Sequence, residues 1–271
     1  MKFVPRMPRE GINVSDEHPL VEAATLIAGL LAILVGIALA VVFFVDLVLL
    51  FLSPRVEAWL FQKMMVQQIV AAEYDSEQVR SLQVRVDRLA DRWQENPYEF
   101  RAGILIADEP NALALPGGVI LVTTALLEQT ESENELAFII GHEIGHFRNR
   151  DHLRQLGRAA LLSLIVAAVL GQNSESLGGN VIGLTMSSFS RGQESEADQF
   201  GLKLVYEAYG HVGQAWRFFE RIAEGEGELG SFAAFAASHP APKDRIDQML
   251  RLAKRNDWPV DGLITPLDPT L

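Results

Sequence analysis

The chain has 271 residues, a net charge of −12 and a pI near 5.0, and 49% of its residues are hydrophobic. Binding to nucleic-acid phosphates needs clustered basic side chains, so no nucleic-acid partner is expected of so acidic a chain. There is no cysteine, which excludes disulfides and thiolate metal ligands and leaves His, Asp and Glu as candidate ligands. The high apolar content predicts a membrane segment in addition to a packed core.

The first predicted element is a membrane anchor. Residues 23–45 carry no charge, and after Asp46 the apolar character resumes as far as Leu52. About 20 apolar residues in helical form cross a bilayer core, so residues 23–52 are predicted to form one transmembrane helix behind an N-terminal tail of residues 1–22. A cleaved signal peptide is the alternative, but its apolar region is usually shorter, and acidic residues precede the run here.

The charges beside this span predict its orientation. Lys2, Arg6 and Arg9 precede it, whereas Arg55 and Lys63 follow it closely. Positively charged flanks tend to stay in the cytoplasm, so a difference of one residue favours a cytoplasmic N-terminus. The prediction is a single-pass membrane protein whose remaining domain lies on the non-cytoplasmic side.

Residues 54–255 are predicted to form one domain, followed by a C-terminal tail of residues 256–271. Two β-rich runs, at 101–107 and 118–123, flank Asn111 to Gly118 and predict a small sheet. The spacing of apolar residues predicts helices at about 56–72, 76–93, 133–149, 190–208, 212–225 and 242–254. The predicted fold class is therefore α+β, mainly α with a small β-sheet.

The helix at 133–149 carries the most informative motif of the chain, His142-Glu143-Ile144-Gly145-His146. Residues four apart share a helix face, so His142 and His146 can bind one metal ion. Glu143 lies near the same face, where a carboxylate can take a proton from an attacking water. The motif predicts a zinc-dependent hydrolase, and a peptidase is the simplest form of it.

Two neighbouring features support a helix around this motif. Ser132 as N-cap and Glu135 three residues later form a capping-box pattern. Gly145 is less favourable than Ala inside a helix by about 1 kcal/mol. A glycine at this place predicts that something packs closely against the backbone beside the histidines.

A catalytic zinc needs a third protein ligand, and two residues compete for the role. His152 lies six residues after His146, the metzincin spacing, with Asn149 where metzincins usually have glycine. Glu194 is the other candidate, and it shares a helix face with Asp198, which could accept a hydrogen bond from a ligand histidine. The chain after His152 continues as a helix, which favours Glu194.

A second apolar run extends from Ala159 to Leu170. It is shorter than a membrane span, so it is either a buried core helix or a membrane-facing one. A Gly/Ser/Asn-rich break at 171–180 follows it.

Several segments together resemble one family: Asn111 to Gly118, the motif at 142–146, Ser190-Arg191 followed by Glu194 to Asp198, and Ser238-His239-Pro240 with Arg245. The combination resembles the membrane-associated gluzincins, the group with the HtpX heat-shock peptidase, the CAAX prenyl protease and the mitochondrial overlapping-activity peptidase. The likeness covers roughly residues 60–255. It implies a gluzincin metallopeptidase domain with one Zn²⁺ per subunit, held by His142, His146 and Glu194, with Glu143 as catalytic base.

Further roles follow for residues outside the motif. His239 is a candidate for stabilising the oxyanion of the tetrahedral intermediate, or else an ordinary loop histidine. Arg245 is expected to orient that group or to pair with a carboxylate. A substrate strand could pair with an edge at residues 111–115, which could also be a surface loop. The residues of that edge are Asn111, Ala112, Leu113, Ala114 and Leu115.

The predicted function is that of a membrane-anchored zinc endopeptidase that cleaves proteins or peptides, in membrane or envelope protein quality control. One anchor, at residues 23–52, departs from the several spans of the prenyl proteases, so prenylated substrates are not expected. The alternative is a catalytically silent membrane protein that keeps a zinc-stabilised fold for binding or chaperoning.

Overall fold

The computed structural model describes residues 18–68, 72–73, 76–170, 188–224, 233–240, 243–268 and 271. Internal contacts divide the chain into two units, one ending at Phe44 and the other beginning at Val45. Helix α1 (Pro19–Phe51) is long and apolar enough to cross a membrane, and its last turns belong to the second unit. The break predicted at 171–180 lies outside the described residues.

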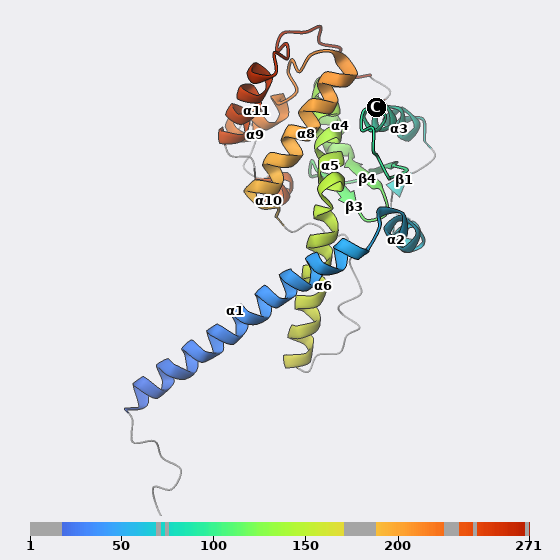
Figure 1. The fold of residues 1–271 in the computed structure, drawn as a ribbon. Helices are drawn as coiled ribbons and strands as arrows, with labels where there is room; N and C mark the ends of the chain where they lie inside the picture. Colours follow the sequence, from blue (N-terminus) through green and yellow to red (C-terminus); the bar gives the residue numbers. More distant parts are fainter. Residues whose placement is uncertain are drawn as a thin grey trace, which may run out of the picture. The chain divides into compact units, whose positions relative to one another are not determined.

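The second unit is mainly helical with one small sheet, as predicted (Figure 1). The metal helix α5 begins and ends at the predicted residues, and the short helices α4 and α10 are additions to the prediction. The helices of this unit are α2 (Pro54–Gln68), α3 (Glu77–Ala90), α4 (Thr124–Gln129), α5 (Glu133–Asn149), α6 (Asp151–Leu170), α8 (Arg191–Tyr209), α9 (Arg217–Glu224), α10 (Ala233–Ser238) and α11 (Lys243–Arg255).

The sheet has four described strands in the order β1-β2-β4-β3. They are β1 (Ala72–Glu73), β2 (Arg101–Leu105), β3 (Ala112–Leu115) and β4 (Val119–Thr123). β2 and β4 are parallel, whereas β3 pairs with β4 in an antiparallel hairpin. The hairpin turn contains Gly117 and Gly118 at φ 92° and 85°, a backbone conformation that favours glycine. β3 and β1 are therefore the two edge strands of the described sheet.

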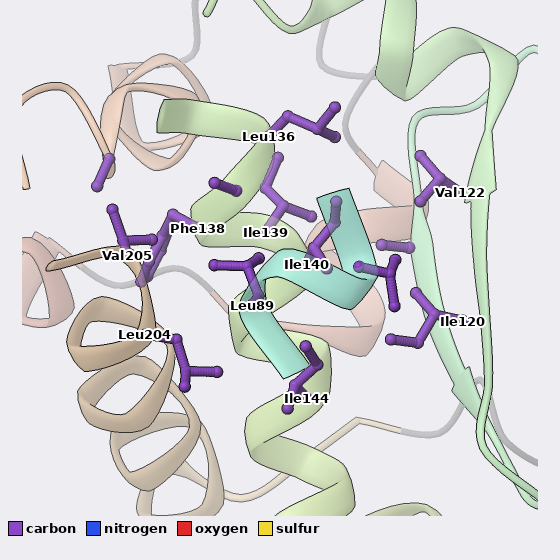
Figure 2. Close-up of a cluster of buried hydrophobic side chains, with 14 of the residues drawn as sticks. Leu89, Ile120, Val122, Leu136, Phe138, Ile139, Ile140, Ile144, Leu204 and Val205 are labelled. Atoms are coloured by element: carbon purple, nitrogen blue, oxygen red, sulfur yellow. The ribbon is translucent and has the colours of Figure 1, made fainter. Parts of the chain in front are cut away.

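Helix α5 lies at the centre of the core. Figure 2 shows its apolar side chains between those of the sheet and those of the neighbouring helices. Every residue of α5 from Glu133 to Phe147 is buried. The labelled side chains of this cluster are Leu89, Ile120, Val122, Leu136, Phe138, Ile139, Ile140, Ile144, Leu204 and Val205. Burial of each large apolar side chain contributes about 1.5–3 kcal/mol, so this packing fixes the helix that carries the motif.

The opposite face of the sheet is covered by α2. Leu113, Leu115, Val119 and Leu121 form a separate buried cluster, and Phe61 of α2 packs against it. The strands are therefore apolar on both faces, which explains why β3 and β4 read as continuous apolar runs.

Helices α5 and α8 approach each other backbone to backbone. A Cβ atom added at Gly145 would lie 2.7 Å from the Cα of Ala197 on α8, and one added at Gly201 would lie 2.7 Å from the backbone N of His142. Such contacts are too short for a side chain, so glycine is required on both helices. The prediction that something packs against the backbone at Gly145 is confirmed.

The start of α5 matches the predicted cap only in part. The Ser132 hydroxyl accepts a hydrogen bond from the Glu135 backbone N–H at 3.3 Å. The Glu135 carboxylate, however, accepts from the Glu131 backbone N–H at 3.1 Å and pairs with Arg221. The reciprocal half of the capping box was therefore wrong, because the partly buried Arg221 competes for the Glu135 carboxylate.

The C-terminal segment completes this helix start. The Glu133 backbone N–H donates to the Thr265 carbonyl at 3.0 Å, and Ser132 forms a β-bridge with Pro266. Leu267 and Leu271 pack against the main core. Residues 256–271, predicted as a tail, thus include parts that contribute to the fold.

Helix α6 packs by its first turns against the end of α1. Asp46 pairs with Arg154 at 3.1 Å and with Arg158 at 3.4 Å, and a Cβ at Gly157 would lie 3.1 Å from Val45 Cγ1. The apolar run from residue 159 forms the second half of α6. Leu162 in this run is 44% exposed, so this part of α6 is not a fully buried core helix.

Replacing Gly201 with Ala is expected to destabilise the protein by about 1–3 kcal/mol, because the new methyl group would collide with backbone atoms of α5. This loss exceeds the gain of about 1 kcal/mol that Ala gives in a helix. Thermal unfolding of the detergent-solubilised protein measures the difference. Gly192→Ala, on the same helix with nothing within 4 Å, is the matched control and should be neutral or slightly stabilising. An unchanged unfolding temperature in Gly201→Ala would contradict the close approach.

Candidate metal centre

Four side chains from three parts of the fold converge on one point. His142 and His146 extend from α5, Glu194 from the first turn of α8, and His239 follows α10. One ligand atom from each lies within 4.8 Å of those of the others. All four residues are at most 1% exposed.

The distances among these atoms fit a tetrahedral ion. His142 Nε2 lies 3.1 Å from His146 Nε2 and 3.2 Å from His239 Nδ1. Glu194 Oε1 lies 3.3 Å from His239 Nδ1 and 3.5 Å from His146 Nε2. Ligands bound at about 2.0–2.1 Å in a tetrahedron are separated by about 3.3 Å. The residues present therefore fit a metal ion with nitrogen and oxygen ligands.

The position of His239 was not foreseen from the sequence. It was expected beside a reacting group, and its Nε2 does lie 3.5 Å from Glu143 Oε1. Its Nδ1, however, occupies a corner of the ligand set. Only the path of the chain after α10 brings it there, so no local pattern could have identified it as a candidate ligand.

Each histidine of the motif has its own carboxylate. The Nδ1–H of His142 donates to Asp198 at 2.9 Å, and the Nδ1–H of His146 donates to Asp151 at 3.0 Å. Carboxylates only accept here, so the neutral form of each ring carries its proton on Nδ1 and directs its Nε2 lone pair at the centre, as a metal ligand requires. Asp198 was expected in this role. Asp151 was missed, although it follows the motif closely in sequence.

Arg245 from α11 ties the centre together. It forms two hydrogen bonds with Asp198, at 2.7 and 2.6 Å, and its Nη1 also contacts Glu194. The same Nη1 donates to the Pro240 carbonyl at 2.8 Å, next to His239. The guanidinium of Arg245 thus holds three groups in place: Glu194, Asp198 and the segment that carries His239.

The electrostatics of the cluster favour a cation. Burial raises the pKa of Glu194, but hydrogen bonds with His146 and His239 outweigh it and hold the pKa well below its usual range. Burial lowers the pKa of His146, yet its hydrogen bonds with Asp151 and Glu194 raise that pKa to about 9. The carboxylates therefore stay ionised and favour positive charge at the centre.

Glu143 is the one acidic residue of the motif and lies at the edge of this cluster. It is fully buried, and neither carboxylate oxygen has a hydrogen-bond partner among the described residues. A buried carboxylate without such partners is unfavourable for stability. Its orphaned oxygens beside the ligand set are what a proton acceptor for water requires.

His152, the metzincin-type candidate ligand, lies elsewhere. Its Nε2 is 2.7 Å from Glu57 Oε1, and it is not among the clustered ligand atoms. The left-handed residue after the motif is Arg150, at φ 59°, rather than Asn149, which is the last residue of α5. The fold thus brings Glu194, and not His152, to the two histidines of the motif.

The segment proposed as a substrate edge lies beside the centre and is covered. Asn111 accepts from the Ala112 backbone N–H at 2.9 Å and contacts the Ser238 hydroxyl at 3.5 Å, next to His239. All four residues of β3 are buried. Within the described residues, Asn111 Nδ2 has no hydrogen-bond partner.

Aromatic rings enclose the cluster. Phe189, just before α8, stacks on the His146 ring with centroids 3.8 Å apart, and Phe235 stacks on His239 at 4.9 Å. Among the described cavities that reach the centre, one of about 150 Å³ borders Glu194 and Arg245. This cavity is too small for a peptide.

Asp151→Asn is expected to weaken metal binding by about 10–100-fold, because an amide orients His146 less well and stabilises its Nδ1 proton less. Competition with a chromogenic chelator measures the affinity without any substrate. Asp91→Asn, at the exposed end of α3, is the control and should bind metal as the unchanged protein does. Equal affinities in the two variants would show that Asp151 does not orient a ligand.

Relatives with known names share this part of the chain. Mitochondrial metalloendopeptidase OMA1 of Schizosaccharomyces pombe is 35% identical over 143 residues, which cover 51% of this chain and 42% of OMA1. Metalloprotease LoiP of Escherichia coli is 28% identical over 200 residues, 71% of this chain and 75% of LoiP. The beta-barrel assembly-enhancing protease of Yersinia pestis is 29% identical over 153 residues, 51% of this chain and 31% of that protein. The chain thus spans less than half the length of the first and third.

The match to a family covers most of the chain. Residues 76–253 match Peptidase family M48, a range that includes α5, α8 and most of α11 and contains every group of the cluster. The metal-capable cluster agrees with the names metalloendopeptidase and metalloprotease that the relatives carry. The chain belongs to peptidase family M48.

Proposed function

We propose that this protein is a membrane-anchored zinc endopeptidase that cleaves peptide bonds of proteins. The observation that carries the proposal is the convergence of His142, His146 and Glu194 beside the orphaned carboxylate of Glu143. Family membership and the names of the relatives support a protease. Because the chain spans less than half of several relatives, its activity is argued from its own residues.

Zinc is the proposed metal, one ion per subunit. The donor set contains imidazole nitrogens and a carboxylate at tetrahedral spacing, which suits zinc better than magnesium or calcium, since these prefer oxygen ligands. We assign His142, His146 and Glu194 as the ligands, with Asp198 and Arg245 holding them in place. Zinc bound there would lower the pKa of a water molecule and polarise the scissile carbonyl.

The chain's own groups then move the protons. Glu143 takes a proton from the attacking water and passes it to the leaving amine. His239 is proposed to stabilise the oxyanion through its Nε2–H, the nitrogen that faces Glu143. In that role its Nδ1 leaves the ligand corner it occupies here, because a catalytic zinc needs one open position.

The substrate is proposed to bind as an added strand along β3. β3 is at one edge of the described sheet, and Asn111 just before it contributes an amide donor that has no partner within the described residues. Strand addition uses backbone hydrogen bonds and therefore tolerates many sequences, as a general endopeptidase needs. Since β3 is buried here, the edge has to be uncovered before a substrate can pair with it.

The cellular setting is proposed from the anchor and the relatives. Within the described residues, α1 is a candidate span, which supports a membrane protein. We propose that residues 54–255 form the peptidase domain on the non-cytoplasmic side and act in membrane or envelope protein quality control. The segments at 111–118, 142–146, 190–198 and 238–245 together carry the likeness to the HtpX and CAAX prenyl protease group, and we propose membership in that subgroup.

A catalytically silent binding protein is the second candidate, favoured by one observation. The groups of the centre are at most 1% exposed, so no substrate reaches them in this form. Casein cleavage by the purified full chain separates the two candidates if a chelator abolishes it and added zinc restores it.

Glu143→Gln is expected to keep zinc and to lower peptide hydrolysis by at least about 10²–10⁴-fold, because the amide cannot accept the proton from water. Zinc content is measured by mass spectrometry and hydrolysis with a quenched peptide. The exposed Glu128→Gln is the control and should cleave normally. Normal cleavage by Glu143→Gln would sink the mechanism.

Glu194→Ala is expected to lose zinc during dialysis, since it removes one of three ligands. His152→Gln, which keeps a hydrogen-bond donor for Glu57, should retain a full zinc content. Loss of zinc from His152→Gln with full zinc in Glu194→Ala would favour the metzincin arrangement instead.

A further inference from the structure

A buried carboxylate outside the metal centre has no part in the chemistry proposed above. Glu57 lies in the first turn of α2, directly after the membrane helix, and is fully buried. Removing an ionised carboxylate from water is unfavourable unless several donors surround it. The burial of the Glu57 carboxylate therefore needs a structural explanation.

Four donors surround Glu57. They are Tyr98 Oη at 3.0 Å, His152 Nε2 at 2.7 Å, Arg150 Nη2 at 3.2 Å and the Gly117 backbone N–H at 3.4 Å. Burial raises the pKa of Glu57, but the contacts with His152, Tyr98 and Arg150 outweigh it and lower the pKa. We call these five residues the Glu57 junction.

Arg150 connects the junction to the end of the membrane helix. Its Nη1 donates to the Leu49 carbonyl at 2.8 Å and also to the Leu52 carbonyl. The last carbonyls of a helix have no partner within it, so this guanidinium caps the end of α1. Arg150 also terminates α5 in a left-handed conformation at φ 59°, which a non-glycine residue adopts only when its surroundings hold it there.

The junction reaches the metal centre on one side. Asp151 follows Arg150 in the chain and accepts the Nδ1–H of His146 at 3.0 Å. The backbone conformation that Arg150 keeps therefore decides where the Asp151 carboxylate meets the imidazole. An unpaired Arg150 would free the end of α5 and the partner of a ligand histidine.

The junction reaches the substrate edge on the other side. Gly117 is in the turn that joins β3 to β4, at φ 92°, and its N–H points to Glu57 Oε1. Its position sets where the edge strand ends. Glu57 thus contacts the two parts of the fold that bind metal and substrate in the proposed enzyme.

We propose that Glu57 is a positioning residue of the peptidase: it holds the end of the membrane helix, the end of the metal helix and the turn after β3 in one arrangement. The membrane anchor then contributes to the geometry of the active site as well as to location. The part of this inference that concerns substrate binding, measured as KM, rests on the proposed function. The part that concerns the metal site, measured as zinc affinity, requires only that the protein binds the ion.

The test uses the full chain in detergent micelles. Glu57→Gln keeps the shape of the side chain but removes the charge and half of the acceptor capacity, so zinc affinity should fall by about tenfold and KM should rise by about tenfold. Glu77→Gln is the matched control, an exposed glutamate in the first turn of α3, and should stay within about twofold of the unchanged protein in both values. Both values are measured well below the unfolding temperature.

Two gentler variants keep the proposal testable if Glu57→Gln fails to fold. Arg150→Lys cannot reach Glu57 and the α1 carbonyls together, so it should weaken zinc binding but leave KM unchanged. Tyr98→Phe keeps the ring contacts and removes one donor, so it should shift both values in the direction of Glu57→Gln by about two- to threefold. A mere loss of stability would lower the unfolding temperature and leave these two values unaltered.

The outcomes separate this inference from the proposed function. Unchanged zinc affinity and KM in folded Glu57→Gln, Arg150→Lys and Tyr98→Phe would overturn the positioning role. If the unchanged protein binds zinc but cleaves nothing, the proposed function fails, whereas the chelator competition still decides whether the junction orients the metal site. A fall in zinc affinity in Glu57→Gln without one in Glu77→Gln supports the junction in either case.

Discussion

The close approach of α5 and α8 is the constraint on which the rest of the structure depends. Gly145 and Gly201 allow the two backbones to touch, and no side chain fits between them. At this separation, Glu194 in the first turn of α8 falls beside the histidines on α5. If α5 and α8 were further apart, the same side chains could not reach one metal ion. Backbone packing, more than the motif itself, therefore creates the metal site.

Burying so many charged groups is possible because each has an opposite partner. Asp198 and Glu194 share Arg245, and Asp151 faces His146. Each pair limits the free energy lost by removing charge from water, and each also fixes an orientation. Glu143 differs within this part of the fold, since its oxygens accept no hydrogen bond and its described ion-pair contact is the long one with His239 Nε2, at 3.5 Å. Stability and reactivity are thus divided between neighbouring carboxylates.

The sequence predicted what depends on local spacing. The bounds of α5 and the α+β class follow from apolar periodicity. The position of Glu194 and Asp198 on one helix face follows from their spacing of four residues. The place of His239 among the candidate ligands and the ion pair of Glu135 with Arg221 depend on chain segments that come together only in the folded state. The spacing of residues along the sequence does not predict such long-range contacts. The sheet edge was expected, but its burial was not.

The β-bridge between Ser132 and Pro266 has a consequence for the order in which the parts of the chain fold. Synthesis runs from the N-terminus, so the helix with the motif leaves the ribosome long before residues 265 and 266. Until those residues arrive, the Glu133 N–H lacks its carbonyl partner and the start of the helix is incomplete. The first turn of the helix that carries the motif is therefore completed only by the last part of the chain to be synthesised, about 120 residues after the motif itself has formed.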